Sequence, residues 1–177
     1  MHPEYYIPLN LPQDPRHESF KWPVDRKRIM ENLWEMTWSE SISSDVRVIL
    51  QSRGIRAWRS TIFYTEGIKD YSPHIDCVRP GSLGCWGLHW YFGSPCVLKW
   101  YDSLEDKKDH HIVRAAWDAK SVIYETVVQS PCLIRINRAH SVHNTEDRER
   151  WAIRLTGMPD TWDEIKSKLQ DLFLNPV

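Results

Sequence analysis

The sequence predicts a mainly β fold, a sandwich or barrel with flanking helices, and three observations support this prediction. Short β-branched and aromatic runs follow one another from about residue 59 to Gly157, separated by turn residues. Segments with helical periodicity lie on either side of them. The chain has 177 residues, which suffices for one buried core but not for two comfortable domains. We therefore expect one domain spanning residues 1–177.

The first 24 residues predict an extended arm on the surface. They are rich in proline, with Pro3, Pro8, Pro12, Pro15 and Pro23. Proline lacks a backbone donor and favours extended structure over helix. We also expect this arm to help cover a ligand pocket.

Residues 25–58 predict a helical support for the β core. An amphipathic helix is expected from Asp25 to about Trp38, because Ile29, Leu33 and Trp34 fall on one stripe. Asp25 is of a residue type that caps helix N-termini. Such a helix would pack on a sheet.

The β core is expected over residues 59–157. Its candidate strands are RSTIFYT near 59–65, the HID segment at 74–76, CWGLHWYF, CVLKWYD, SVIYETVV, CLIRIN and WAIRLTG. The polar stretch 103–111 predicts a loop that projects outward. The longer segment 103–120 is expected to help cover a pocket.

A closing helix is predicted over residues 161–174. Thr161 stands where a cap is needed. The residues Ile165, Leu169, Leu172 and Phe173 then fall on one apolar face.

Composition argues against several classes of partner. Lys and Arg number 23 against 24 Asp and Glu, so the net charge of −1 gives no overall attraction to nucleic acid or membrane.

The cysteines, Cys77, Cys85, Cys96 and Cys132, form no CxxC pair, and the N-terminus lacks the layout of a signal peptide. We expect free thiols and a cytoplasmic location. The oligomeric state is not predicted.

Two imidazoles and one carboxylate predict a metal site. His74 and Asp76 in YSPHID are two residues apart, so in a strand they share a face. His140 in RAHSV supplies a second imidazole. Two histidines and one carboxylate with positions left open form the facial triad of non-haem Fe(II) enzymes. Ten residues after His140, Arg150 is placed to bind a carboxylate through its two-pronged guanidinium.

These motifs, in their order, resemble the Fe(II)/2-oxoglutarate-dependent oxygenases of the prolyl-hydroxylase-like group. The resemblance runs over residues 60–157 and includes TEGIKD before HID, GSPCVLKWYD, CLIRIN, HSV and RWAI. It implies a double-stranded β-helix, a jelly-roll or cupin-like barrel of two antiparallel sheets. It also implies a reaction that uses Fe(II), O2 and 2-oxoglutarate, releases succinate and CO2, and hydroxylates a C–H bond of an amino acid, a peptidyl residue or a small molecule.

The resemblance also implies roles for individual residues. His74, Asp76 and His140 would hold the iron. Arg150 would pair with the distal carboxylate of 2-oxoglutarate, and Tyr64 would hydrogen-bond the same co-substrate.

Two of these assignments have alternatives in the sequence. His143 lies three residues after His140, and Arg154 stands in an Arg-Leu-Thr string that also suits a carboxylate clamp. Arg150 and Arg154 share strand parity, so both are expected to face inward. The motif pattern favours His140 and Arg150.

The sequence also offers candidates for the residues around the substrate. Tyr71, His89 and Trp90 are candidates for its pocket, and Trp86 is a further aromatic wall.

Two other functions fit the same sequence. A cupin-like metal enzyme would hold a metal without using 2-oxoglutarate. A noncatalytic β-sandwich module would instead bind a ligand on tryptophans, of which the chain has ten.

Overall fold

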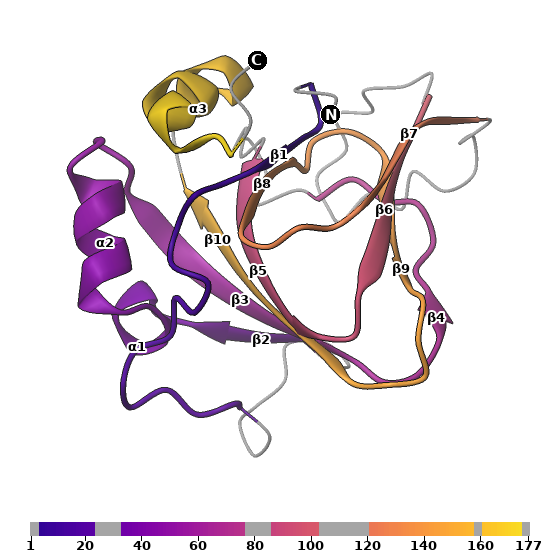
Figure 1. Cartoon of the computed structure of the whole chain (residues 1–177), viewed down its shortest axis with the longest axis horizontal. Coiled ribbons are helices and arrows are strands. Elements are labelled where there is room, and N and C mark those ends of the chain that lie inside the picture. Colours follow the sequence, from indigo (N-terminus) through magenta and orange to yellow (C-terminus); the bar gives the residue numbers. More distant parts are fainter. Residues whose placement is uncertain (1–3, 24–32, 77–85, 103–120, 158–160, 175–177) are drawn as a thin grey trace.

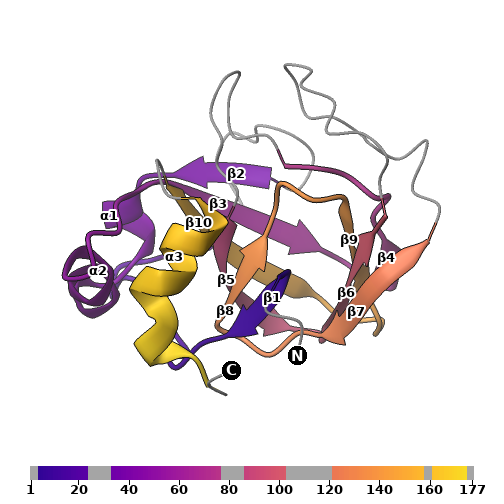
Figure 2. The same ribbon diagram turned by 90° about the horizontal axis from the view of Figure 1, so that it is seen from above.

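Two antiparallel sheets face one another in the computed structural model, which describes residues 4–23, 33–76, 86–102, 121–157 and 161–174 (Figures 1 and 2). The larger sheet has the order β1(Tyr6–Pro8), β8(Cys132–Arg135), β5(Trp86–Gly93), β10(Arg150–Gly157), β3(Ala57–Thr65), β2(Leu33–Met36). The smaller sheet has the order β4(Lys69–Asp70), β9(His140–Asn144), β6(Cys96–Tyr101), β7(Val122–Val127). The predicted jelly-roll barrel with flanking helices is confirmed.

Strand alternation divides the larger sheet into two faces. In β5, Trp86, Leu88 and Trp90 pack into the main apolar core, whereas His89 and Tyr91 face the space between the sheets. The period of two therefore sends apolar side chains to one side and polar side chains to the other.

Helices cover the outer face of the larger sheet (Figure 2). They are α1(Trp38–Ser41), α2(Ser44–Gln51) and α3(Trp162–Leu169), followed by the short η2(Gln170–Leu172). Val46 and Leu50 of α2 and Ile165 and Leu169 of α3 are fully buried in the main core. Each such side chain contributes about 1.5–3 kcal/mol relative to exposure. No helix in these parts of the chain is long and apolar enough to cross a bilayer.

The helix expected from Asp25 to about Trp38 is wrong over its described part. Residues 33–36 form β2 and pair with β3, while residues 25–32 lie outside the described residues. Trp34 and Met36 are buried and Glu35 between them is exposed, which is the period of a strand. Pairing with β3 therefore decides the structure of residues 33–36, although their apolar side chains also fit the spacing of a helix.

The prediction of a surface arm is also wrong for the first part of that segment. Tyr6–Pro8 is the edge strand β1, paired with β8, and Ile7 and Leu9 are fully buried. Pro8 is compatible with this place because an edge strand leaves one row of donors unpaired. The β core therefore extends beyond residues 59–157 into the N-terminal segment.

The polar segment HSVHN forms strand β9, which its sequence does not predict. Its pairing with β6 and β4 supplies the backbone partners that fix it as a strand. The expected outward loop at 103–111 and the expected pocket cover at 103–120 lie outside the described residues.

The predicted cap of the C-terminal helix is confirmed. Thr161 accepts from the backbone N–H of Glu164, whose side chain accepts from the backbone N–H of Thr161. Replacing Thr161 by alanine is expected to destabilise the protein by about 1 kcal/mol. That loss lowers Tm by about 2–4 °C in a chain of this size. Thermal unfolding checks it, with Thr161→Ser as the control that keeps the cap; equal loss in both variants would contradict the capping role.

Candidate metal site

A cavity of about 190 Å³ lies between the two sheets. Its apolar wall includes Leu33, Phe63, Val142 and Ala152. The polar side chains on it include the three predicted metal ligands, His74, Asp76 and His140, and both arginines of β10. Drug-sized ligands occupy sites of roughly 300–1,000 Å³, so this cavity favours a smaller molecule.

The backbone brings the three predicted ligands together. His74 and His140 form an isolated antiparallel bridge, with N–H···O distances of 2.8 and 2.9 Å between them. The N–H of Asp76 donates to the carbonyl of Ile136 at 3.0 Å. Two segments separated by more than 60 residues are thereby fixed side by side.

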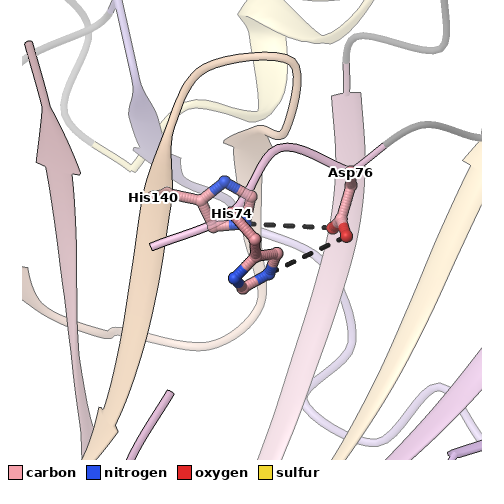
Figure 3. Close-up of side chains that lie close together, drawn as sticks. All are labelled: His74, Asp76 and His140. Atoms are coloured by element: carbon pink, nitrogen blue, oxygen red, sulfur yellow. Dashed lines mark ion pairs between the residues drawn. The ribbon is translucent and has the colours of Figure 1, made fainter. Parts of the chain in front are cut away.

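The donor atoms of the triad converge on one point (Figure 3). Nε2 of His74 lies 3.8 Å from Oδ1 of Asp76, and Nε2 of His140 lies 3.8 Å from Oδ2. Both gaps are too long for hydrogen bonds. Two metal–ligand bonds of about 2.1 Å each span at most about 4.2 Å, so this spacing would suit residues that hold one ion together. The donor set fits a divalent metal ion.

Hydrogen bonds fix both imidazoles in the tautomer that a metal needs. Nδ1 of His74 lies 2.9 Å from the carbonyl of Ser72, and Nδ1 of His140 lies 2.8 Å from the carbonyl of Arg138. A carbonyl only accepts, so each Nδ1 carries the proton and donates it. The lone pair of each Nε2 is left facing Asp76, the arrangement typical of metal-binding histidines.

The protonation states of His140 and Asp76 also suit the binding of a cation. Burial, with a contribution from His74, lowers the pKa of His140 to about 4. Burial alone would raise the pKa of Asp76, but Arg154 and the nearby histidines outweigh it and the pKa falls below its usual range. At neutral pH, His140 is therefore uncharged and Asp76 is ionised, so a metal ion displaces no proton from either.

His143, the alternative ligand, points to the other side of β9. Its Nδ1 lies 2.6 Å from Oδ1 of Asp70 and its Nε2 lies 2.6 Å from Oγ of Ser141, which also contacts the Tyr101 hydroxyl at 2.8 Å. Residues three apart in a strand face opposite sides. The structure thus places His140, and not His143, in the triad.

Arg150 is buried in the cavity wall, with 4% of the residue exposed. One Nη2–H donates to Oγ1 of Thr65 at 3.0 Å, and the guanidinium lies 5.5 Å from the Tyr91 ring centroid. Its Nε has no partner, and among the described residues no carboxylate pairs with it. A buried guanidinium without an anion is costly and is compensated when an anionic ligand binds.

Arg154, the alternative clamp, is already engaged. Its Nη1–H donates to Oδ2 of Asp76, and its guanidinium lies 4.7 Å from the Phe63 ring centroid. Arg150 and Arg154 both line the cavity, as their shared parity predicts.

Tyr64 does not turn its ring into the cavity. It contributes to the lining, but its ring packs at 4.6 Å on Trp151 and against the main core. Strand alternation places Thr65, and not Tyr64, on the face that Arg150 shares.

Of the other residues predicted for the substrate pocket, some line the cavity and others lie in the main core. Tyr71 and His89 line the cavity. Trp86 and Trp90 are fully buried in the main core, and the Trp90 Nε1–H donates to the carbonyl of Pro12 at 2.9 Å. No tryptophan whose side chain the structure describes lines the cavity, so it offers no support for a tryptophan-lined groove there.

Sequence reasoning missed two polar residues of the wall, Thr65 and Tyr91. The Tyr91 hydroxyl lies 3.0 Å from Nδ1 of His89, and burial keeps its pKa well above the ordinary value, so it remains a phenol. Residue 91 shares parity with His89, and Thr65 is the register partner of Arg150. The first signal is in the sequence, but the second needs the pairing of β3 with β10.

Comparisons with known proteins give distant fold similarity alone. No protein-family model matches the chain, and no curated protein sequence matches it either. Among solved structures, oxalate oxidase in complex with the substrate analogue glycolate is 12% identical with a TM-score of 0.42, covering 78% of this chain and 58% of that one. E. coli ycfD is 14% identical with a TM-score of 0.42, covering 68% and 31%.

Bacillus subtilis oxalate decarboxylase, described with Mn(II) centres, is 8% identical with a TM-score of 0.40. The alignment covers 73% of this chain and 26% of that one. The chain thus spans between about a quarter and somewhat over half of these three proteins. At such identities and TM-scores the similarities carry no argument about activity, and the fold assignment rests on the strand order described above.

Proposed function

We propose that the protein is a metal-dependent oxygenase that uses 2-oxoglutarate as co-substrate. His74, Asp76 and His140 would hold the metal, for which Fe(II) suits the donor set. Arg150 would bind the far carboxylate of the 2-oxo acid. The observation that carries the proposal is a buried arginine, in the wall of the same cavity as the triad, that pairs with no carboxylate among the described residues.

The spacing of two arginines along β10 favours an elongated co-substrate. Arg154 contacts Asp76, so it marks the metal end of the cavity on β10. Arg150 lies four residues away on the same face, which is about 13 Å along the strand. The Arg150 side chain covers part of this distance. A molecule that binds the metal at one end and Arg150 at the other must be elongated and anionic at its far end. A five-carbon 2-oxo dicarboxylate has that shape, whereas a one- or two-carbon acid is too short.

Polar neighbours prepare Arg150 for a carboxylate. Oγ1 of Thr65 accepts from Arg150 and lies 3.0 Å from the Tyr71 hydroxyl. If Tyr71 donates to Thr65, the Thr65 hydroxyl proton is free to donate to a ligand oxygen. Arg150 and Thr65 together would then provide charge and hydrogen bonds at one point.

The metal, when bound, would supply the O2 chemistry that oxidises the 2-oxo acid to succinate and CO2 and hydroxylates a substrate C–H bond. The chain's own part is positioning. The imidazoles are held by backbone carbonyls, Asp76 supplies the negative charge, and the apolar side chains Leu33, Phe63 and Val142 limit water in the cavity. The substrate is proposed as an amino acid, a peptidyl residue or a small molecule.

The test is turnover of 2-oxoglutarate by protein reconstituted with Fe(II) in air. With ascorbate supplied as the reductant that takes the place of a primary substrate, we expect succinate to form stoichiometrically with CO2, at a slow rate that stops when metal is chelated. Asp76→Ala is the matched inactive variant. Bound metal with no succinate above that of Asp76→Ala would contradict the proposal.

A second candidate is a metal enzyme of the same fold that acts directly on a small carboxylic acid and uses no 2-oxoglutarate. The observation that favours it is the ring of Tyr64, which packs on Trp151 in place of facing the co-substrate. It predicts retained metal, no succinate, and turnover of a small acid that still depends on His140.

A further inference from the structure

Arg154 makes a contact that neither the metal site nor the co-substrate site requires. It donates to Oδ2 of Asp76, one of the two carboxylate oxygens available to a metal. Oδ2 also lies 3.8 Å from Nε2 of His140, whereas Oδ1 lies 3.8 Å from Nε2 of His74. The two oxygens of Asp76 therefore have different surroundings.

The guanidinium of Arg154 is held from several sides. Strand β10 lies between β3 and β5, so the side chain rises from the middle of the larger sheet. Its guanidinium lies over the Phe63 ring at 4.7 Å, a cation–π contact. Its side chain is 13% exposed, so the contact with Asp76 is shielded from solvent.

Gly87 leaves the room that this arrangement needs. A Cβ atom at residue 87 would lie 3.1 Å from Cδ of Arg154 and 2.6 Å from Nε2 of His89. The second distance is too short for unbonded atoms, so a side chain there would displace His89 and press on Arg154. The absence of a side chain at this position lets Arg154 reach across to Asp76.

This contact has two consequences for a metal ion. A guanidinium that donates to Oδ2 weakens this oxygen as a metal donor and leaves Oδ1 as the stronger one, which favours binding through one oxygen. A divalent ion at the triad must also share Asp76 with a positive charge already present, which opposes its binding.

We propose that Arg154 is a positioning residue that restricts Asp76 to one metal-binding oxygen and thereby keeps a coordination position open. The inference rests on the metal site of the proposed function and does not depend on 2-oxoglutarate. The open position is the one that O2 or a co-substrate oxygen needs, and the cost is a lower affinity for the ion.

The test uses Mn(II) alone, with the 177-residue chain under conditions that preserve the fold. The EPR signal of free Mn(II) gives the affinity, and the water-proton relaxivity of bound Mn(II) gives the number of coordinated waters. In Arg154→Gln, we expect affinity to rise about tenfold because a like charge is removed. We expect the relaxivity per bound ion to fall, because Oδ2 replaces a water.

Two further variants separate this role from a structural one. Arg154→Lys keeps the charge and one donor, and we expect it to restore wild-type affinity and relaxivity. Arg59→Gln breaks an arginine–carboxylate ion pair, with Glu35 at 2.7 Å, whose residues do not line the cavity, and it should change neither quantity. Arg154→Met, which keeps the apolar stem, replaces the Gln variant if the latter does not fold.

The outcomes distinguish the two proposals. Wild-type affinity and relaxivity in both Arg154→Gln and Arg154→Met would overturn the inference while leaving the metal site intact. Weaker binding in these variants would overturn it as well, since Arg154 would then support binding. Absence of Mn(II) binding in the wild-type protein would overturn the metal site and this inference together.

Discussion

Replacing His140 by alanine is expected to remove metal binding, with a loss of affinity greater than about 100-fold. Loss of a hydrogen-bond partner behind a metal ligand already costs about 10–100-fold, so loss of the ligand itself must cost more. His140 is buried, carries its proton on Nδ1 and directs Nε2 to Asp76, and no other described imidazole on β9 faces the cavity. Equilibrium dialysis against Fe(II) or Co(II) measures the effect.

His143→Ala is the matched control for this prediction. His143 lies on the same strand and is partly buried, but it pairs with Asp70 and Ser141 on the other face. We expect its metal affinity to stay near that of the wild type. The reverse pattern, with metal lost in His143→Ala and kept in His140→Ala, would contradict the triad.

Replacing Arg150 by methionine is expected to weaken 2-oxoglutarate binding by at least about 100-fold. A hydrogen bond to a charged group is worth about 1.5–3 kcal/mol, and a bidentate carboxylate contact comprises two of them. Arg150 makes no contact with the triad in the described residues, so metal affinity should not change. Calorimetric titration of metal-loaded protein with 2-oxoglutarate measures the loss.

Arg148→Met serves as the control for Arg150. Arg148 is only two residues away but is exposed and pairs with Glu146 outside the cavity. We expect its co-substrate affinity to equal that of the wild type. Unchanged affinity in Arg150→Met would show that the far carboxylate of 2-oxoglutarate binds elsewhere and would contradict the role proposed for Arg150.

The sequence predicts most of the β core because its strands carry their own period. In β5 and β10, apolar and polar residues alternate, and this alternation depends on side chains within one strand. The cap at Thr161 is likewise local. The segment at Leu33–Met36 is the counterexample, because a helical stripe and a strand alternation coincide there and only pairing with β3 decides between them.

The site is harder to predict because it depends on register between distant strands. His74, Asp76 and His140 can be selected by motif, but their convergence requires the bridge between residues 74 and 140. Tyr64 is one residue out of phase with the cavity, since alternation turns Thr65 inward. The contact of Arg154 with Asp76 joins two segments 78 residues apart, and no local pattern indicates it.

The central claim is that the triad and Arg150 together bind an iron–2-oxo acid pair, and anaerobic optical titration tests it most directly. Chelation of Fe(II) by a 2-oxo acid gives a weak visible charge-transfer band. We predict that 2-oxoglutarate produces this band in the wild type and in His143→Ala, that His140→Ala abolishes it, and that Arg150→Met requires at least about 100-fold more 2-oxoglutarate. Stoichiometric Fe(II) in the wild type without a band at saturating 2-oxoglutarate would contradict the account.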